Sequence, residues 1–232
     1  MSDGRTYSEF VTPQARDYLN ALLVANGDRD KYRQAMYHLG GALGEQLSQE
    51  IAGLSSICVV STAEDADYLT RGLLEVLDRL PSLDIALVCF WHERWSAGRE
   101  NISVAPITRR YIEPKSKGHI DAVIVLKSII ATSCVVRTDL TEILTSTQPD
   151  QIFIVAPVAY TKSRESLQSE FSPDISEKFD YLYFAEDSKI DSSGTVWPGI
   201  GGSLYELLDI QVDKDRSYGP SLLKERRQRL SR

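Results

Sequence analysis

Apolar residues follow two different periods along the chain. Between Asp30 and Leu54 they recur every three or four positions, which predicts one long amphipathic helix that Asp28 can cap at its start. From Ser56 onward, short β-branched runs alternate with helical stretches. Such runs joined by helices are typical of a parallel sheet that is covered on both faces. The sequence therefore predicts an α/β domain with helices before the sheet.

The predicted strands cover residues 57–60, 85–91, 120–126 and 151–158. The helices between them are expected at residues 64–80, 133–144 and 163–171. Ser61 and Glu64 have the spacing of a capping box at the first of these helices, and residues 99–114 alternate weakly, which predicts a hairpin arm. We expect one domain over residues 30–210, with a helical segment (1–29) before it and a basic helical tail (211–232) after it.

Composition narrows the class of protein. The chain has 232 residues, a net charge of −7 and 42% hydrophobic residues, which excludes a disordered, fibrous or generally polycationic protein. No apolar run approaches the roughly 20 residues of a membrane span, and the stretch from Met1 to Arg5 lacks the layout of a secretory signal. Cys58, Cys89 and Cys134 show no C-x-x-C spacing, so neither disulfides nor a zinc site are indicated. We expect a cytoplasmic protein.

The end of the chain is basic although the whole chain is acidic. Residues 219–232 contain one acidic residue, Glu225, and the five basic residues Lys224, Arg226, Arg227, Arg229 and Arg232. A run of one sign is usually a solvated tail or a short exposed helix. The alternative is an arm that binds an acidic partner subunit or the phosphates of a nucleic acid.

Three glycines interrupt the long predicted helix. Gly40, Gly41 and Gly44 each cost about 1 kcal/mol relative to alanine, so close packing against another backbone is the expected reason. That backbone belongs either to the same subunit or to a second copy of the chain. In the second case the protein is a two-fold homodimer with the helix from Tyr32 to Ile51 at or beside the interface.

Ligands of parallel sheets bind at the carboxyl ends of the strands, where the strand-to-helix loops gather. Here these loops are residues 61–67, 91–100, 127–135 and 195–205. None of them contains a Gly-x-Gly-x-x-Gly or Gly-Lys-Ser/Thr phosphate loop. His38, His92 and His119 show neither metal-ligand spacing nor a partnered nucleophile, so we predict no catalytic residue and no metal site.

Several short motifs occur in a fixed order along these segments. The long helix contains Tyr32-Arg33, Leu39-Gly40, Leu43 and Glu45, the next helix contains Gly72-Leu73-Leu74, and Leu80-Pro81 follows it. The last loop contains Thr195-Val196-Trp197-Pro198-Gly199-Ile200-Gly201. Over about residues 30–210 this order resembles the uracil phosphoribosyltransferase family, a branch of the type I phosphoribosyltransferases. The resemblance implies that fold and, in an active member, transfer of phosphoribosyl from phosphoribosyl diphosphate to uracil with Mg²⁺.

The resemblance also implies substrate-binding positions. Arg94 falls on the arginine of the family's second loop, and the Pro-Gly-Ile-Gly segment falls where the family's backbone hydrogen-bonds uracil, with Trp197 beside it as a stacking face. The family's phosphoribosyl diphosphate loop, Asp-Pro-Met-Leu-Ala-Thr-Gly-Gly-Ser, corresponds to residues 127–135. The implied set is Arg94, Ala131, Thr132, Ser133, Trp197, Pro198, Gly199, Ile200 and Gly201.

Three of the four substrate loops depart from the family's chemistry, and in the last of them the family's acidic Asp-Ala-Gly-Asp is replaced by Gly202-Ser203-Leu204-Tyr205. Lys127 replaces the acidic residue that grips the ribose hydroxyls, and Ser133 and Cys134 bring side chains where glycines leave the backbone bare. Glu64-Asp65 replaces the arginine-containing diphosphate contact of the first loop. We expect Cys134 to be a packed thiol. Glu64 either caps its helix or, with Asp65, forms an ion pair with Lys127 across the cleft.

The hydrophobic framework of the family is kept, whereas the substrate loops have lost its ligand chemistry. This combination predicts a relative of uracil phosphoribosyltransferase that has neither transferase activity nor a cofactor. Such a protein would act as a ligand-binding regulatory or scaffold subunit. One alternative is an active, Mg²⁺-dependent transferase for uracil or another base. Another is a nucleic-acid-associated component of a multi-protein complex.

Overall fold

The computed structural model describes residues 4–25, 27–93, 95–97, 102–191, 194–208, 210 and 218–231. In this part of the chain the main sheet has eight strands: β1 (Arg5–Tyr7), β2 (Ser56–Thr62), β3 (Asp84–His92), β6 (Ile107–Ile112), β7 (Gly118–Leu126), β8 (Ile129–Ile130), β9 (Thr147–Tyr160) and β10 (Phe179–Asp187). Their order is β1-β10-β9-β7-β2-β3-β6, and β8 pairs with β9. Strands β10, β9, β7, β2 and β3 run parallel, whereas the edge strands β1 and β6 are antiparallel. The predicted, mostly parallel sheet is confirmed.

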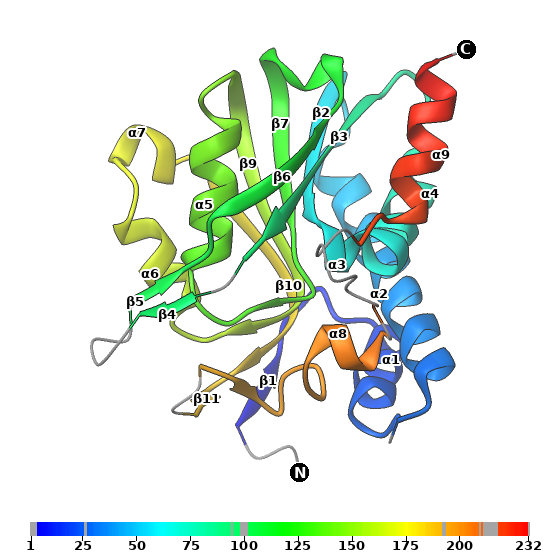
Figure 1. Cartoon of the computed structure of the whole chain (residues 1–232), viewed down its shortest axis with the longest axis vertical. Coiled ribbons are helices and arrows are strands. Elements are labelled where there is room, and N and C mark those ends of the chain that lie inside the picture. Colours follow the sequence, from blue (N-terminus) through cyan, green and yellow to red (C-terminus); the bar gives the residue numbers. More distant parts are fainter. Residues whose placement is uncertain are drawn as a thin grey trace.

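Helices cover both faces of this sheet (Figure 1). On one face lie α1 (Pro13–Leu23), α2 (Arg29–Glu50), α3 (Ala63–Asp65), the π-helical turn η1 (Ala66–Thr70), α4 (Arg71–Leu77) and α9 (Ser221–Leu230). On the other lie α5 (Cys134–Ile143), α6 (Ser163–Ser169) and α7 (Pro173–Ser176). The short elements are the 3-10 turn η3 (Pro114–Ser116), α8 (Leu204–Leu207), and the pair β11 (Lys189–Ile190) and β12 (Val196–Trp197). No helix of the described residues is both long and apolar enough to cross a bilayer.

The long N-terminal helix agrees with its prediction. Asp28 caps α2 by accepting a 3.1 Å hydrogen bond from the backbone N–H of Lys31. Leu39, Leu43 and Leu47 of its apolar stripe are fully buried in the core on this face. The same core contains buried residues of α1 and α9, so these helices of the terminal segments pack with the domain.

The glycines of α2 allow close contact with η1 and α4 of the same chain. A Cβ at Gly40 would lie 2.0 Å from the carbonyl oxygen of Leu69, and one at Gly44 would lie 3.0 Å from that of Leu73. On the facing helix, a Cβ at Gly72 would lie 2.0 Å from the carbonyl oxygen of Tyr37. The glycines therefore serve packing inside the subunit, and a dimer interface is not their cause. Homodimerisation itself stays a prediction.

Replacing Gly40 by alanine is expected to destabilise the protein by at least about 3 kcal/mol, because the helix backbones must separate to admit the methyl group. Gly41 is the matched control on the same helix. Its Cβ would lie 3.8 Å from the carbonyl oxygen of Gly72, an ordinary contact, so Gly41→Ala should gain up to about 1 kcal/mol from helix propensity. Urea unfolding of both variants measures the difference. Equal stability of the two would contradict the packing.

Three local predictions need correction. Ser61 lies within β2 and its Oγ shares a 2.6 Å hydrogen bond with Oγ1 of Thr70, so it does not form the predicted capping box. Thr62 takes the N-cap position instead. Of the predicted arm at residues 99–114, only β5 (Ile102–Val104) forms a hairpin, with β4 (Trp95–Ala97), while β6 joins the main sheet. Strands β1 and β10 were not predicted at all.

The basic tail ends in a helix that is docked along one side. Leu222 and Leu223 are buried, and Asp67 of η1 accepts hydrogen bonds from the backbone N–H groups of Ser221 (3.1 Å) and Leu222 (2.9 Å). Arg226 pairs with the buried carboxylate of Glu113 at 2.7 Å. The predicted helix is confirmed and most of its residues are exposed, but its docked side shows that it is not a wholly solvated tail. Binding of an acidic partner or of a nucleic acid stays a prediction. Arg232 lies outside the described residues.

Candidate functional site

A buried ion cluster occupies the carboxyl ends of β2 and β7. The Lys127 ammonium donates to Oγ1 of Thr62 at 2.7 Å, pairs with the carboxylate of Asp65, and lies 3.3 Å from Oε1 of Glu64. The hydroxyl of Thr62 in turn donates to Oδ2 of Asp65 at 2.9 Å. The Lys127 and Glu64 side chains are 3% and 5% exposed, and that of Asp65 is fully buried. The ion pair predicted across the cleft is therefore confirmed.

Strand order explains why these residues meet. Strands β2 and β7 are parallel neighbours with Val60 opposite Val125, so the segments that follow them emerge at the same edge of the sheet. Lys127 is the first residue after β7, and the three-residue helix α3 directly after β2 carries both carboxylates. At such short range and low dielectric, the attraction between the charges offsets the cost of removing them from water only when their polar atoms are also hydrogen-bonded.

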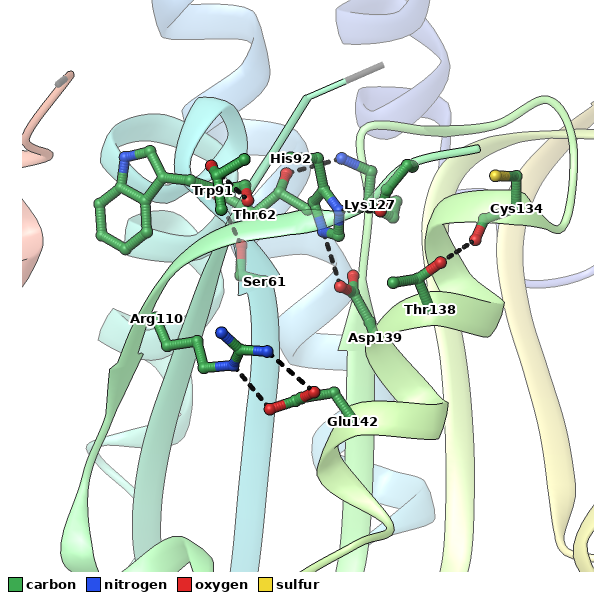
Figure 2. A network of polar contacts seen from close by, with 12 residues as sticks. Ser61, Thr62, Trp91, His92, Arg110, Lys127, Cys134, Thr138, Asp139 and Glu142 are labelled. Atoms are coloured by element: carbon green, nitrogen blue, oxygen red, sulfur yellow. Dashed lines mark hydrogen bonds and ion pairs between the residues drawn. The ribbon is translucent and has the colours of Figure 1, made fainter. Parts of the chain in front are cut away.

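A second polar pair, which was not predicted, lies beside this cluster (Figure 2). His92, the last residue of β3, donates from Nδ1 to the carbonyl oxygen of Ala105 at 2.9 Å. Its Nε2 shares a 2.7 Å hydrogen bond with Oδ1 of Asp139 on α5. Burial raises the pKa of the Asp139 carboxyl, an effect opposed by His92 and by the charge of Lys127. The two pairs are thus electrostatically coupled.

The loop that corresponds to the phosphoribosyl diphosphate loop encloses little space. Ala131, Thr132 and Cys134 line, together with Lys127, a cavity of about 70 Å³. Known ligand pockets hold about 300–1,000 Å³, so this cavity suits a few water molecules. Ser133 occupies the N-cap position before α5, and its hydroxyl donates to the carboxylate of Glu170. Cys134 is 6% exposed, which agrees with the predicted packed thiol.

The predicted base-binding segment is held by hydrogen bonds from other parts of the chain. The N–H of Gly199 donates to Oδ2 of Asp187 at 2.8 Å, and the carbonyl of Gly199 accepts from Nη2 of Arg5 at 2.6 Å. The hydroxyl of Tyr32 donates to the carbonyl of Ile200 at 2.9 Å. Three backbone groups of this segment therefore already have partners within the chain.

The other predicted site residues differ in their surroundings. Trp197 is 57% exposed, and Nζ of Lys189 lies 5.7 Å from the centre of its ring. A cis peptide bond links it to Pro198, and Gly199 and Gly201 adopt positive φ values. The segment borders the cavity, because a Cβ at Gly199 would lie 3.4 Å from Cδ1 of Ile129, which lines it. Arg94 lies outside the described residues.

One group with the composition of a metal site lies far from the ion cluster in the sheet. His119, Asp121 and Asp150 place ligand atoms within 4.8 Å of one another near the start of β7 and in the first part of β9. His119 and Asp150 are exposed and share a 3.1 Å hydrogen bond, while Asp121 accepts from the backbone N–H groups of Ser55 and Ser56. One hydrogen bond thus joins His119 to Asp150, whereas Asp121 is bound to the neighbouring Ser55–Ser56 segment, and the group takes no part in the ion cluster.

Comparison with known proteins gives sequence and fold relatives. No protein-family model matches the chain. A uracil phosphoribosyltransferase from Sulfolobus acidocaldarius is 24% identical over 204 residues, which cover 79% of this chain and 90% of the relative. One from Natronomonas pharaonis is 24% identical over 163 residues, covering 68% and 67%. The solved structure of the AQ2163 protein from Aquifex aeolicus superposes with a TM-score of 0.67 at 18% identity, covering 89% of this chain and all of that one. In sequence the chain is similar to uracil phosphoribosyltransferases, and in architecture it is a mostly parallel α/β protein similar to the AQ2163 protein.

Proposed function

We propose that this protein is a non-catalytic, phosphoribosyltransferase-like subunit with a regulatory or scaffold role, and that it does not transfer phosphoribosyl groups. One observation carries the proposal: Lys127 is buried between the carboxylates of Asp65 and Glu64. By resemblance to uracil phosphoribosyltransferases, Lys127 takes the position of the ribose contact and the carboxylates take that of the diphosphate contact.

Electrostatics opposes binding of phosphoribosyl diphosphate at this cluster. Two like unit charges 4 Å apart repel by about 4 kcal/mol at an effective dielectric of about 20. A diphosphate beside Glu64 and Asp65 would meet that repulsion, and it would have to separate Lys127 from its buried partners. The ammonium of Lys127 has no acceptor to offer the ribose hydroxyls. The cavity of about 70 Å³ next to it is also too small for a phosphoribosyl group.

We expect no UMP when the purified protein is incubated with uracil, phosphoribosyl diphosphate and Mg²⁺. We also expect titration calorimetry to detect no binding of phosphoribosyl diphosphate. The groups that would contact the diphosphate, Glu64 and Asp65, are negatively charged and buried against Lys127. An active uracil phosphoribosyltransferase, run in parallel, serves as the positive control. Turnover near the usual enzymatic range of about 1–1,000 per second would overturn the proposal.

The competing function is an active transferase for uracil or another base. Two observations favour it: both sequence relatives are named uracil phosphoribosyltransferase, and the Pro198-Gly199-Ile200-Gly201 segment is retained. The UMP assay separates the two functions for uracil. The same assay with other nucleobases, followed through diphosphate release, extends the test to the remaining substrates.

A further inference from the structure

Three basic side chains lie on α9 and on the edge strand β6, which α9 contacts through Arg227 and Tyr111. They are Arg109 of β6 and Lys224 and Arg227 of α9, called here the α9–β6 cluster. Arg109 lies over the ring of Trp91 at 4.7 Å, and Arg227 lies over the ring of Tyr111 at 5.1 Å. Arg109 and Tyr111 are two residues apart in one strand, so they share a face of the sheet. Lys224 and Arg227 are three residues apart and share a face of the helix.

Lys224 lies close to the 218–219 segment, which contacts Trp91. Its Cε would be 3.8 Å from a Cβ at Gly219, and the neighbouring Tyr218 accepts a 2.6 Å hydrogen bond at its carbonyl from the indole N–H of Trp91. Since Arg109 covers the Trp91 ring, contacts through Trp91 and the 218–219 segment connect Lys224 to Arg109. Arg109 and Lys224 thus lie around Trp91 and the 218–219 segment, and Arg227 shares a face of α9 with Lys224.

The surface is held in place by ion pairs that use other cations. Arg226 binds Glu113 at 2.7 Å and the carbonyl of Ile85 at 2.9 Å, and Glu225 binds Arg71 at 2.8 Å. These contacts fix the position of α9 before any partner arrives, which lowers the entropy cost of binding.

The cations of this cluster form no ion pair in the described part of the chain. Arg226, Arg71 and Arg229 each face a carboxylate. In contrast, Arg109 and Arg227 contact aromatic rings, and no ion pair of Lys224 is found among the described residues. All three side chains of the cluster are exposed. A chain with net charge −7 thus presents three exposed cations outside ion pairs on α9 and β6.

We propose that the α9–β6 cluster binds the phosphate backbone of a nucleic acid, without sequence preference. A guanidinium that stacks on a ring keeps its N–H edge for a phosphate, which it can bind in a bidentate manner. The rings beneath are covered, since Trp91 is 7% and Tyr111 6% exposed, so no apolar centre is available for a protein partner. Polar, strongly positive surfaces are typical of nucleic-acid interfaces.

Fluorescence anisotropy with labelled single-stranded DNA and RNA tests the proposal on the full chain. Three phosphate contacts predict that affinity falls by about 20-fold between 50 and 200 mM salt, from a slope of about −2 for single strands. The triple variant Arg109→Gln, Lys224→Gln, Arg227→Gln should bind at least about 10-fold more weakly at low salt. Circular dichroism checks that it remains folded.

A matched variant removes the same charge from other exposed positions. It combines Arg229→Gln on the opposite side of α9 with Lys31→Gln and Lys162→Gln elsewhere. We expect its affinity to stay within about twofold of the parent. An equal loss in both triple variants would overturn the proposal, as would binding that does not change with salt. If the protein binds poly-glutamate as tightly as it binds nucleic acid, the proposal is wrong and the surface binds an acidic protein instead.

Discussion

Replacing Lys127 by methionine is expected to lower the free energy of unfolding by about 3–5 kcal/mol. Methionine fills a similar volume but leaves the carboxylates of Asp65 and Glu64 without the cation that Lys127 provides in a dry environment. Removing one partner of a buried ion pair costs far more than the pair contributes, because the remaining charge stays desolvated. Urea unfolding at neutral pH, followed by circular dichroism, measures the loss.

Lys115 supplies the control for this variant. It also pairs with an aspartate, Asp84, at 2.6 Å, but these side chains are 64% and 63% exposed. Exposed pairs contribute about 1 kcal/mol or less, so Lys115→Met should be nearly neutral. Adding Asp65→Asn to Lys127→Met should restore part of the stability, because one uncompensated charge is removed. A loss for Lys127→Met no larger than that for Lys115→Met would show that water reaches the cluster and screens it.

The ion cluster could be predicted because it depends on local rules alone. Parallel strands deliver their following residues to one edge of the sheet, and the sequence places Lys127 after one strand and Glu64-Asp65 after another. The pair His92 and Asp139 depends in addition on where α5 lies over the sheet. A signal was present nevertheless: Asp139 falls between Val136 and Ile143 on the buried stripe of its helix, where a charged residue requires a partner.

The elements that were not predicted have partners far away in the sequence. Strand β10 contains Asp180, Glu186 and Asp187, which interrupt its apolar run, and Asp187 is tolerated because Arg5 of β1 neutralises it. The tail looked solvated by composition because Glu113, Asp67 and Arg71, which hold α9, lie more than a hundred residues before it. Charge counts along a segment cannot report on carboxylates that the fold brings in from elsewhere.

The pair of Arg5 and Asp187 connects the N-terminal strand to the predicted base-binding segment. Nε and Nη2 of Arg5 donate to the two carboxylate oxygens of Asp187, each at 2.7 Å, and both side chains are fully buried. Both residues also bind the backbone of Gly199. One bidentate ion pair therefore fixes the ends of β1 and β10 and the turn at Gly199 together.

Replacing Arg5 by methionine, or Asp187 by asparagine, should each destabilise the protein by about 3 kcal/mol or more, because each leaves a buried charge without its counter-charge. The double variant should be more stable than the Arg5→Met single variant, since no unpaired charge remains and the asparagine oxygen can still accept from the Gly199 N–H. Urea unfolding gives the three free energies, and fluorescence of Trp197 beside the turn reports local loosening. If the loss of unfolding free energy in the double variant equals the sum of the two single losses, the two side chains stabilise the fold independently. That result would contradict the role of the bidentate pair in holding the turn.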